Sequence, residues 1–86
     1  SLTYLISLRL NLNLIKDLKT GTFDSFEKLT DLILSENMIY YLPPKIFSKL
    51  SSLKTLLLNK NLIKTLSSDS FYGLESNLET LDLGSN

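Results

Sequence analysis

The sequence predicts a stacked repeat of the α/β class, a right-handed solenoid whose concave face is a parallel β-sheet. Two observations lead to this prediction: an asparagine that returns at a nearly constant interval, and a leucine pattern that precedes it each time. Asn13, Asn37 and Asn61 are 24 residues apart, and Asn86 follows after 25. A fixed period of this size indicates structural units that stack on one another.

The leucine pattern explains how such units would stack. Each asparagine closes a segment of the form LxxLxLxxN, and the leucines are Leu5, Leu8 and Leu10, then Leu29, Leu32 and Leu34, then Leu53, Leu56 and Leu58, then Leu78, Leu81 and Leu83. In LxxLxL the last two leucines alternate, so both point to one face of an extended strand. Successive strands would run in the same direction about 4.8 Å apart, joined by right-handed crossovers. The leucines would then form one continuous core that no single unit could bury alone.

The asparagines lie where the chain turns away from each strand. A buried turn leaves backbone N–H and C=O groups that need partners. An amide supplies both a donor and an acceptor, so each asparagine is expected to bond the neighbouring coils on both sides. An isolated asparagine would more often be a solvated turn residue. Four in register favour a structural ladder of Asn13, Asn37, Asn61 and Asn86.

Phenylalanines recur at the same interval as the leucines. Phe23, Phe47 and Phe71 are each 24 residues apart and are expected to stack edgewise on the far side of the core. An aromatic ligand box is the alternative interpretation, but the shared period favours the core.

Taken together, these positions resemble leucine-rich repeats of the 24-residue extracellular animal type, as found in Toll-like receptors, chaoptin and Slit. The pattern LxxLxLxxNxLxxLxxxxFxxLxx is met three times, with Ile15, Leu18, Phe23 and Phe26 after the first asparagine, Ile39, Leu42, Phe47 and Leu50 after the second, and Ile63, Leu66, Phe71 and Leu74 after the third. The resemblance implies irregular or 3₁₀ convex coils rather than long helices. Pro43-Pro44 agrees, because proline disrupts helices.

The pattern divides the chain into one array over residues 1–86, with a partial start at 1–4, units at 5–28, 29–52 and 53–77, and a partial end at 78–86. One residue is inserted within Glu75-Ser76-Asn77, and Leu2 fits the last apolar position of a preceding unit. A chain that starts and stops within its pattern is expected to come from a longer protein. More repeats or capping motifs at both ends would cover the leucines of the end coils.

Composition argues against several classes of function. Nine basic and nine acidic residues cancel, so no field favours nucleic acid or direct contact with a membrane. Without His or Cys there is no ordinary nucleophile–base pair or zinc site. The carboxylates have no EF-hand spacing. We therefore expect no enzyme activity, no metal and no cofactor.

The strand positions between the leucines would form the concave face, and this face is the predicted site for another protein. The candidates are Arg9, Asp31, Ile33, Thr55, Leu57, Thr80 and Asp82. In the central column, Ile33 and Leu57 lie between Arg9 and Asp82, and an apolar centre with a charged rim is typical of a binding hot spot. The alternative is that aliphatic residues merely suit a strand and that single exposed apolar residues need no explanation.

The expected function is protein recognition at the cell surface or outside the cell. Four strands about 4.8 Å apart make a face of a few hundred Å², less than the roughly 800 Å² per partner of a standard interface. The chain would therefore supply part of a larger site. The resemblance implies a receptor, including those of innate immunity, or an adhesion ectodomain; a homophilic adhesion or matrix protein, or an intracellular array attached to an enzyme, are the alternatives. Fold alone does not name a ligand.

Overall fold

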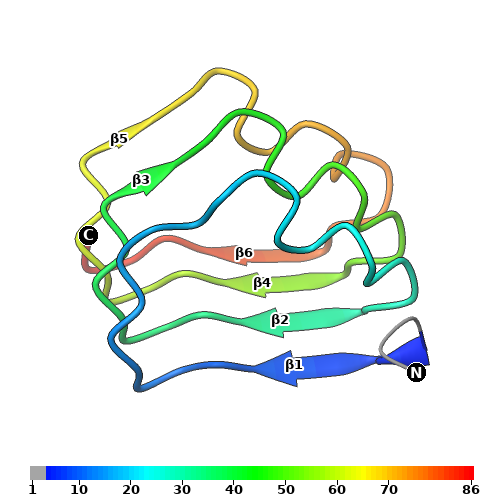
Figure 1. The fold of residues 1–86 in the computed structure, drawn as a ribbon, viewed down its shortest axis with the longest axis horizontal. Helices are drawn as coiled ribbons and strands as arrows, with labels where there is room; N and C mark the ends of the chain where they lie inside the picture. The colour runs from blue at the N-terminus through cyan, green and yellow to red at the C-terminus, as the bar shows by residue number, and fades with distance from the viewer. Residues whose placement is uncertain (1–3) are drawn as a thin grey trace.

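The computed structural model describes residues 4–86 and consists of short strands joined by turns (Figure 1). The strands are β1 (Ser7–Arg9), β2 (Asp31–Ile33), β3 (Tyr41–Leu42), β4 (Thr55–Leu57), β5 (Thr65–Leu66) and β6 (Thr80–Asp82). No α-helix occurs among the described residues. Leu2 and most of the predicted partial start lie outside them.

Four of these strands form one parallel sheet in the order β1-β2-β4-β6. Leu8 is paired with Leu32, Leu32 with Leu56, and Leu56 with Leu81. The register thus advances by the sequence period, and all four arrows in Figure 1 point the same way. The predicted parallel sheet is confirmed, and its outer surface is the concave face.

The return path of each coil is a series of turns at 20–25, 44–49 and 68–73. Their backbone bonds are mostly of the 3₁₀ type, from an N–H to the carbonyl three residues earlier, as from Phe26 to Phe23 and from Leu50 to Phe47. The irregular convex side is confirmed. The inserted residue is taken up by a turn at 75–77, where the Asn77 amide donates to the Ser51 carbonyl at 2.6 Å.

A second, two-stranded parallel sheet pairs β3 with β5, at the upper left of Figure 1. Tyr41 lies beside Thr65, and Leu42 beside Leu66. The sequence did not predict this sheet. Its strands are two residues long, too short for a visible alternation of apolar and polar positions, and they form because stacked coils bring equivalent extended segments together.

The core lies between the two sheets and the convex turns. Leu32 and Leu56 of the middle coils are fully buried, whereas the equivalent Leu81 of the last coil is 40% exposed. A leucine of one coil is thus covered by the leucines of the coils on either side. Burial of such a side chain stabilises the fold by about 1.5–3 kcal/mol, and here that stabilisation depends on neighbouring coils.

The phenylalanine stack lies on the far side of this core, with its rings nearly parallel. The Phe23 and Phe47 centroids are 5.8 Å apart with 29° between the planes, and the Phe47 and Phe71 centroids are 6.4 Å apart with 11°. The expectation of edgewise packing was therefore wrong. Successive coils place equivalent rings in equivalent surroundings, so the rings are related mainly by a translation, which favours stacked rather than edge-on planes.

Gly73 provides a test of how closely the convex turns approach one another. Its φ is +96°, and a Cβ there would lie 2.9 Å from the backbone of Ser48 in the preceding coil. Gly21 has a similar φ of +91°, but a Cβ there would meet only the Asp24 carboxylate at 3.8 Å. We expect Gly21→Ala to cost about 1 kcal/mol through backbone strain, and Gly73→Ala about 2–4 kcal/mol because overpacking is added. Urea unfolding of the two variants measures the difference, and equal losses would contradict the close approach.

Candidate functional site

The turn that ends each strand of the large sheet has one unusual backbone conformation. Leu12, Glu36, Lys60 and Ser85, each directly before a ladder asparagine, have φ values of 59°, 56°, 58° and 56°. Residues other than glycine rarely adopt this left-handed region. Its recurrence in all four coils means that the fold imposes it, and the bend aims the next side chain back into the coil.

In that orientation, the amides of the ladder asparagines form hydrogen bonds with backbone N–H and C=O groups of the turn. Oδ1 of Asn61 accepts the Ile39 N–H at 3.0 Å, and its Nδ2 donates to the carbonyls of Leu34 and Leu58, each at 3.0 Å. Asn37 repeats these contacts with Ile15, Leu10 and Leu34, and Asn86 repeats them with Ile63, Leu58 and Leu83. Asn37 and Asn61 are buried. One amide thus joins two coils.

The intercoil bonds of these amides all run toward the preceding coil. Asn37 bonds Ile15 and Leu10 of the coil before it and otherwise only its own coil. The expectation that each amide bonds the coils on both sides was therefore wrong. Asn13 is exposed and, within residues 4–86, bonds only the carbonyls of its own Leu10 and Asn11. The ladder is directional because the left-handed bend turns every amide the same way.

On the concave face the structure brings the central column together in sequence order. Arg9 is paired with Ile33, Ile33 with Leu57, and Leu57 with Asp82. Ile33 and Leu57 are half-buried, while Arg9 and Asp82 at the two ends are exposed. The face therefore has an aliphatic centre between a cation and an anion.

The neighbouring column consists of Ser7, Asp31, Thr55 and Thr80 in the same register. Asp31 accepts a hydrogen bond from the Thr30 hydroxyl at 3.3 Å, and Asp82 accepts one from the Gly84 N–H at 2.8 Å. Both carboxylates are thus held by local donors but keep acceptor capacity. All seven candidate residues lie on this one face.

Asn59 is a residue of this region that sequence reasoning missed. Within residues 4–86, its Oδ1 is the buried side-chain polar atom without a hydrogen-bond partner. An acceptor left in this state costs about 1–3 kcal/mol, but it is closed off from solvent and is not part of the displayed surface. No sequence signal marks Asn59, because its counterparts are Asn11, Ser35 and Gly84.

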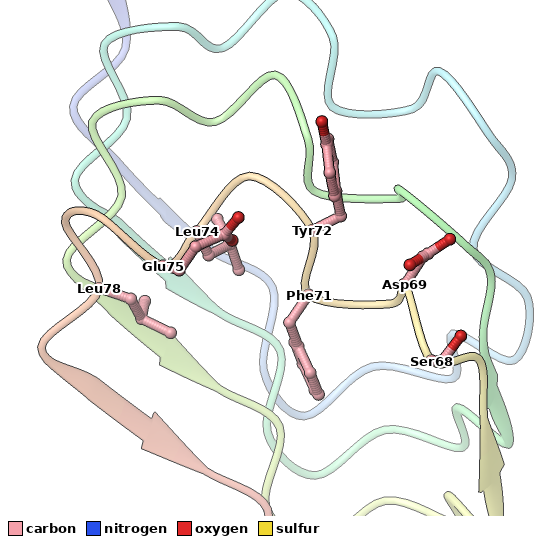
Figure 2. Close-up of a pocket in the computed structure, with 7 residues that line it drawn as sticks. All are labelled: Ser68, Asp69, Phe71, Tyr72, Leu74, Glu75 and Leu78. Carbon is pink, nitrogen blue, oxygen red and sulfur yellow. The ribbon is translucent and has the colours of Figure 1, made fainter.

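A cavity of about 450 Å³ opens at the last coil, lined by Ser68, Asp69, Phe71, Tyr72, Leu74, Glu75 and Leu78 (Figure 2). Phe71, Leu74 and Leu78 occupy core positions of the repeat. In the coil before, the equivalent Phe47 and Leu50 are covered by the following coil. The cavity is thus the uncovered side of the apolar core rather than a grouping of chemically reactive side chains.

Titratable groups form no cluster in the part of the chain that the structure describes. No three acidic side chains there lie close enough to hold a metal ion. The pKa of Tyr40 is raised, first by the hydrogen bond that its hydroxyl donates to Asp17, then by the negative charge of that carboxylate and by desolvation. Residues 4–86 contain no helix that could cross a membrane.

The geometry defines a class of protein: a repeat solenoid that displays a side-chain array on a rigid parallel sheet. The family described as leucine rich repeat matches residues 27–86, and the chain belongs to that family, as its pattern predicted. No curated protein sequence matches the chain.

Among solved structures, the chain is similar to a chain of the Toll–Spatzle complex, described as a molecular hub in Drosophila development and innate immunity. The two are 32% identical with a TM-score of 0.83 over 92% of this chain. The chain spans only 10% of the length of that protein. Family and fold together make this chain a protein-interaction module.

The ladder generates a prediction about stability. Asn61→Ala would leave the buried Ile39 N–H unpaired and would remove one of the two amide donors to each of the Leu34 and Leu58 carbonyls, which keep Asn37 and Asn86. We expect a loss of at least about 2 kcal/mol, because an unpaired buried N–H costs about 1–3 kcal/mol and each lost hydrogen bond adds about 0.5–1.5 kcal/mol. Asn13→Ala is the matched control and should lose less than about 1 kcal/mol, since Asn13 is exposed and water can replace it. Chemical denaturation measures both, and similar losses would contradict the ladder.

Proposed function

We propose that the chain is part of the recognition region of an extracellular receptor or cell-adhesion protein, and that its concave face contacts another protein. The role is binding, without catalysis in this segment. The observation that carries the proposal is the central column, where half-buried Ile33 and Leu57 lie side by side between Arg9 and Asp82. Hot spots combine a desolvated apolar centre with a polar rim.

The interpretation of Ile33 and Leu57 as ordinary strand residues is less favoured on physical grounds. Single exposed aliphatic residues are common on protein surfaces, but these two are adjacent in the register of the sheet. Two adjacent apolar side chains on one face support a surface shaped for a partner.

Further repeats or capping motifs at both ends of the parent protein are part of this proposal. The cavity beside Phe71 and the 40% exposure of Leu81 support it on the side of the last coil, since both are core positions. At the other side, Leu8 and Leu10 are only partly buried. Terminal coils of solenoids need a cover for this apolar surface.

A location at the cell surface or outside the cell is supported by two likenesses. The stack of Phe23, Phe47 and Phe71 resembles the phenylalanine positions of extracellular animal repeats. The similar solved chain comes from a complex of Toll with Spatzle. That complex is one protein recognising another, so it supports a binding role for this chain as well.

Site-specific photocross-linking in the full-length gene product tests the proposal. A benzophenone amino acid would replace Leu57 on the concave face or, as the matched control, the exposed Lys28 in the turn that precedes β2. On intact cells of the source organism, we expect a discrete protein adduct from position 57 and none from position 28. A membrane-impermeant biotin reagent should label the full-length gene product on those cells.

A second experiment tests whether binding of the identified partner depends on Ile33 and Leu57. Replacing Ile33 and Leu57 together by threonine puts at both positions a β-branched residue that suits a strand and removes apolar contact area. We expect affinity for the identified partner to fall at least about 30-fold, the equivalent of about 2 kcal/mol at a hot spot. Unchanged affinity, or equal adducts from position 28, would contradict the role of the concave face, and failure of surface labelling would contradict the extracellular location.

A further inference from the structure

Leu12, Leu14, Tyr40 and Leu62 are each at least half exposed and do not lie on the concave face. They lie where the chain leaves the large sheet, in a surface that we call the lateral flank and define as residues 12–19, 36–43 and 60–67. It includes β3 and β5 and forms the left-hand edge of Figure 1. Backbone bonds of 2.8 Å from Met38 to Ile15 and from Leu62 to Ile39 hold its three rows in register.

An apolar column runs across the lateral flank. Leu14, Met38 and Leu62 occupy the same position in successive coils, and Leu14 and Leu62 are 79% and 50% exposed. Leu12 and Tyr40 beside them are 69% and 51% exposed. Met38, between Leu14 and Leu62, is half-buried, as are Ile33 and Leu57 on the concave face.

This column does not belong to the core. Leu14 and Leu62 lie in the first and last rows of the lateral flank, and in that last row the core position Leu66 is exposed as well. Leu14 and Leu62 point outward in every arrangement of the coils, because the inward positions next to them are taken by Ile15 and Ile63. Scattered apolar residues need no explanation, but contiguous ones indicate an interaction site.

The charges around the column are mainly basic. The lateral flank carries Lys16, Lys19, Lys60 and Lys64 against Asp17 and Glu36, a formal charge of +2 in a chain whose net charge is zero. Lys16 and Lys64 lie in the rows on either side of Tyr40, and Asp17 accepts a hydrogen bond from the Tyr40 hydroxyl. Asp17 and Glu36 keep their negative charges, and the four lysines leave the lateral flank with an excess of two positive charges.

We propose that the lateral flank is a second docking surface, for a protein that presents an apolar ridge edged with carboxylates. The column of exposed Leu14, Leu62 and Tyr40 with half-buried Met38 would receive the ridge, and Lys16 and Lys64 would face the carboxylates. Aromatic and aliphatic anchors surrounded by complementary charge are the usual form of such surfaces.

A second copy of the chain is a poorer occupant. Two flanks of charge +2 repel each other, and the three rows span a few hundred Å² at about 4.8 Å per strand, below the roughly 800 Å² per partner of a stable interface. A partner that is also bound elsewhere on the same protein needs less, because its second contact is then intramolecular. The lateral flank would thus add to another contact rather than act alone.

A random 12-residue peptide library panned against the full-length gene product tests this proposal independently of the concave face. We expect selected peptides to combine leucine or aromatic residues with aspartate or glutamate. Replacing Leu14 and Leu62 together by serine, which leaves the core untouched, should weaken these peptides at least 10-fold. Lys16→Glu with Lys64→Glu should do the same and remove the salt dependence of binding.

Two control variants separate this proposal from the previous one. Ile33→Thr with Leu57→Thr changes the concave face, and Tyr72→Ser removes a similarly exposed apolar residue from the convex side; both should leave the peptides bound. If the selected peptides still bind the Leu14 and Leu62 variant, or no longer bind the concave variant, the proposal of a lateral docking surface is wrong. Either result leaves the proposal for the concave face to be tested separately. Binding of phosphatidylserine vesicles that depends on Leu14 and Leu62, or self-association that depends on them, would also overturn it.

Discussion

In each coil after the first, one buried or partly buried amide side chain closes the turn and bonds the preceding coil, in addition to the hydrogen bonds of the sheet. The bonds of Asn61 satisfy the Ile39 N–H and the Leu34 carbonyl of the preceding coil while closing its own turn at Leu58. Without that amide, a buried turn would leave backbone groups unpaired in an apolar interior. Strand register, leucine packing and the phenylalanine stack all require equivalent residues of neighbouring coils to remain aligned. The columns of the concave face depend on the same alignment of the coils, because they consist of residues that are paired in the sheet.

Periodicity made most of this architecture predictable. Once the interval between the asparagines is known, the pairing of Leu8 with Leu32 and of Ile33 with Leu57 follows, because equivalent residues of stacked coils must meet. The concave columns could therefore be written down from the sequence. The single insertion before Leu78 changed the interval but not the register, since a turn outside the sheet absorbed it.

What could not be predicted depends on direction and orientation rather than on position. A repeat pattern says that Asn37 contacts another coil but not which one, and the left-handed conformation of Glu36 decides it. The sequence does not mark that conformation with a glycine. The residues that adopt it share no chemical feature: they are Leu12, Glu36, Lys60 and Ser85. The parallel planes of Phe47 and Phe71 likewise follow from the translation between coils. The exposed column at Leu14 and Leu62 was missed because the sequence was interpreted along the strands of the large sheet, and these residues lie beyond them.

Hydrogen–deuterium exchange at the Ile39 amide of the full-length gene product tests the ladder most directly. This N–H has the side chain of Asn61 as its acceptor instead of a strand carbonyl. If the ladder holds the coils together, the Ile39 amide exchanges as slowly as the Leu58 amide, which is bonded to Asp82 in the sheet region. Exchange as fast as that of Ser51 in an exposed convex turn would contradict the account, because the coils would then separate at the turn while the sheet stayed intact.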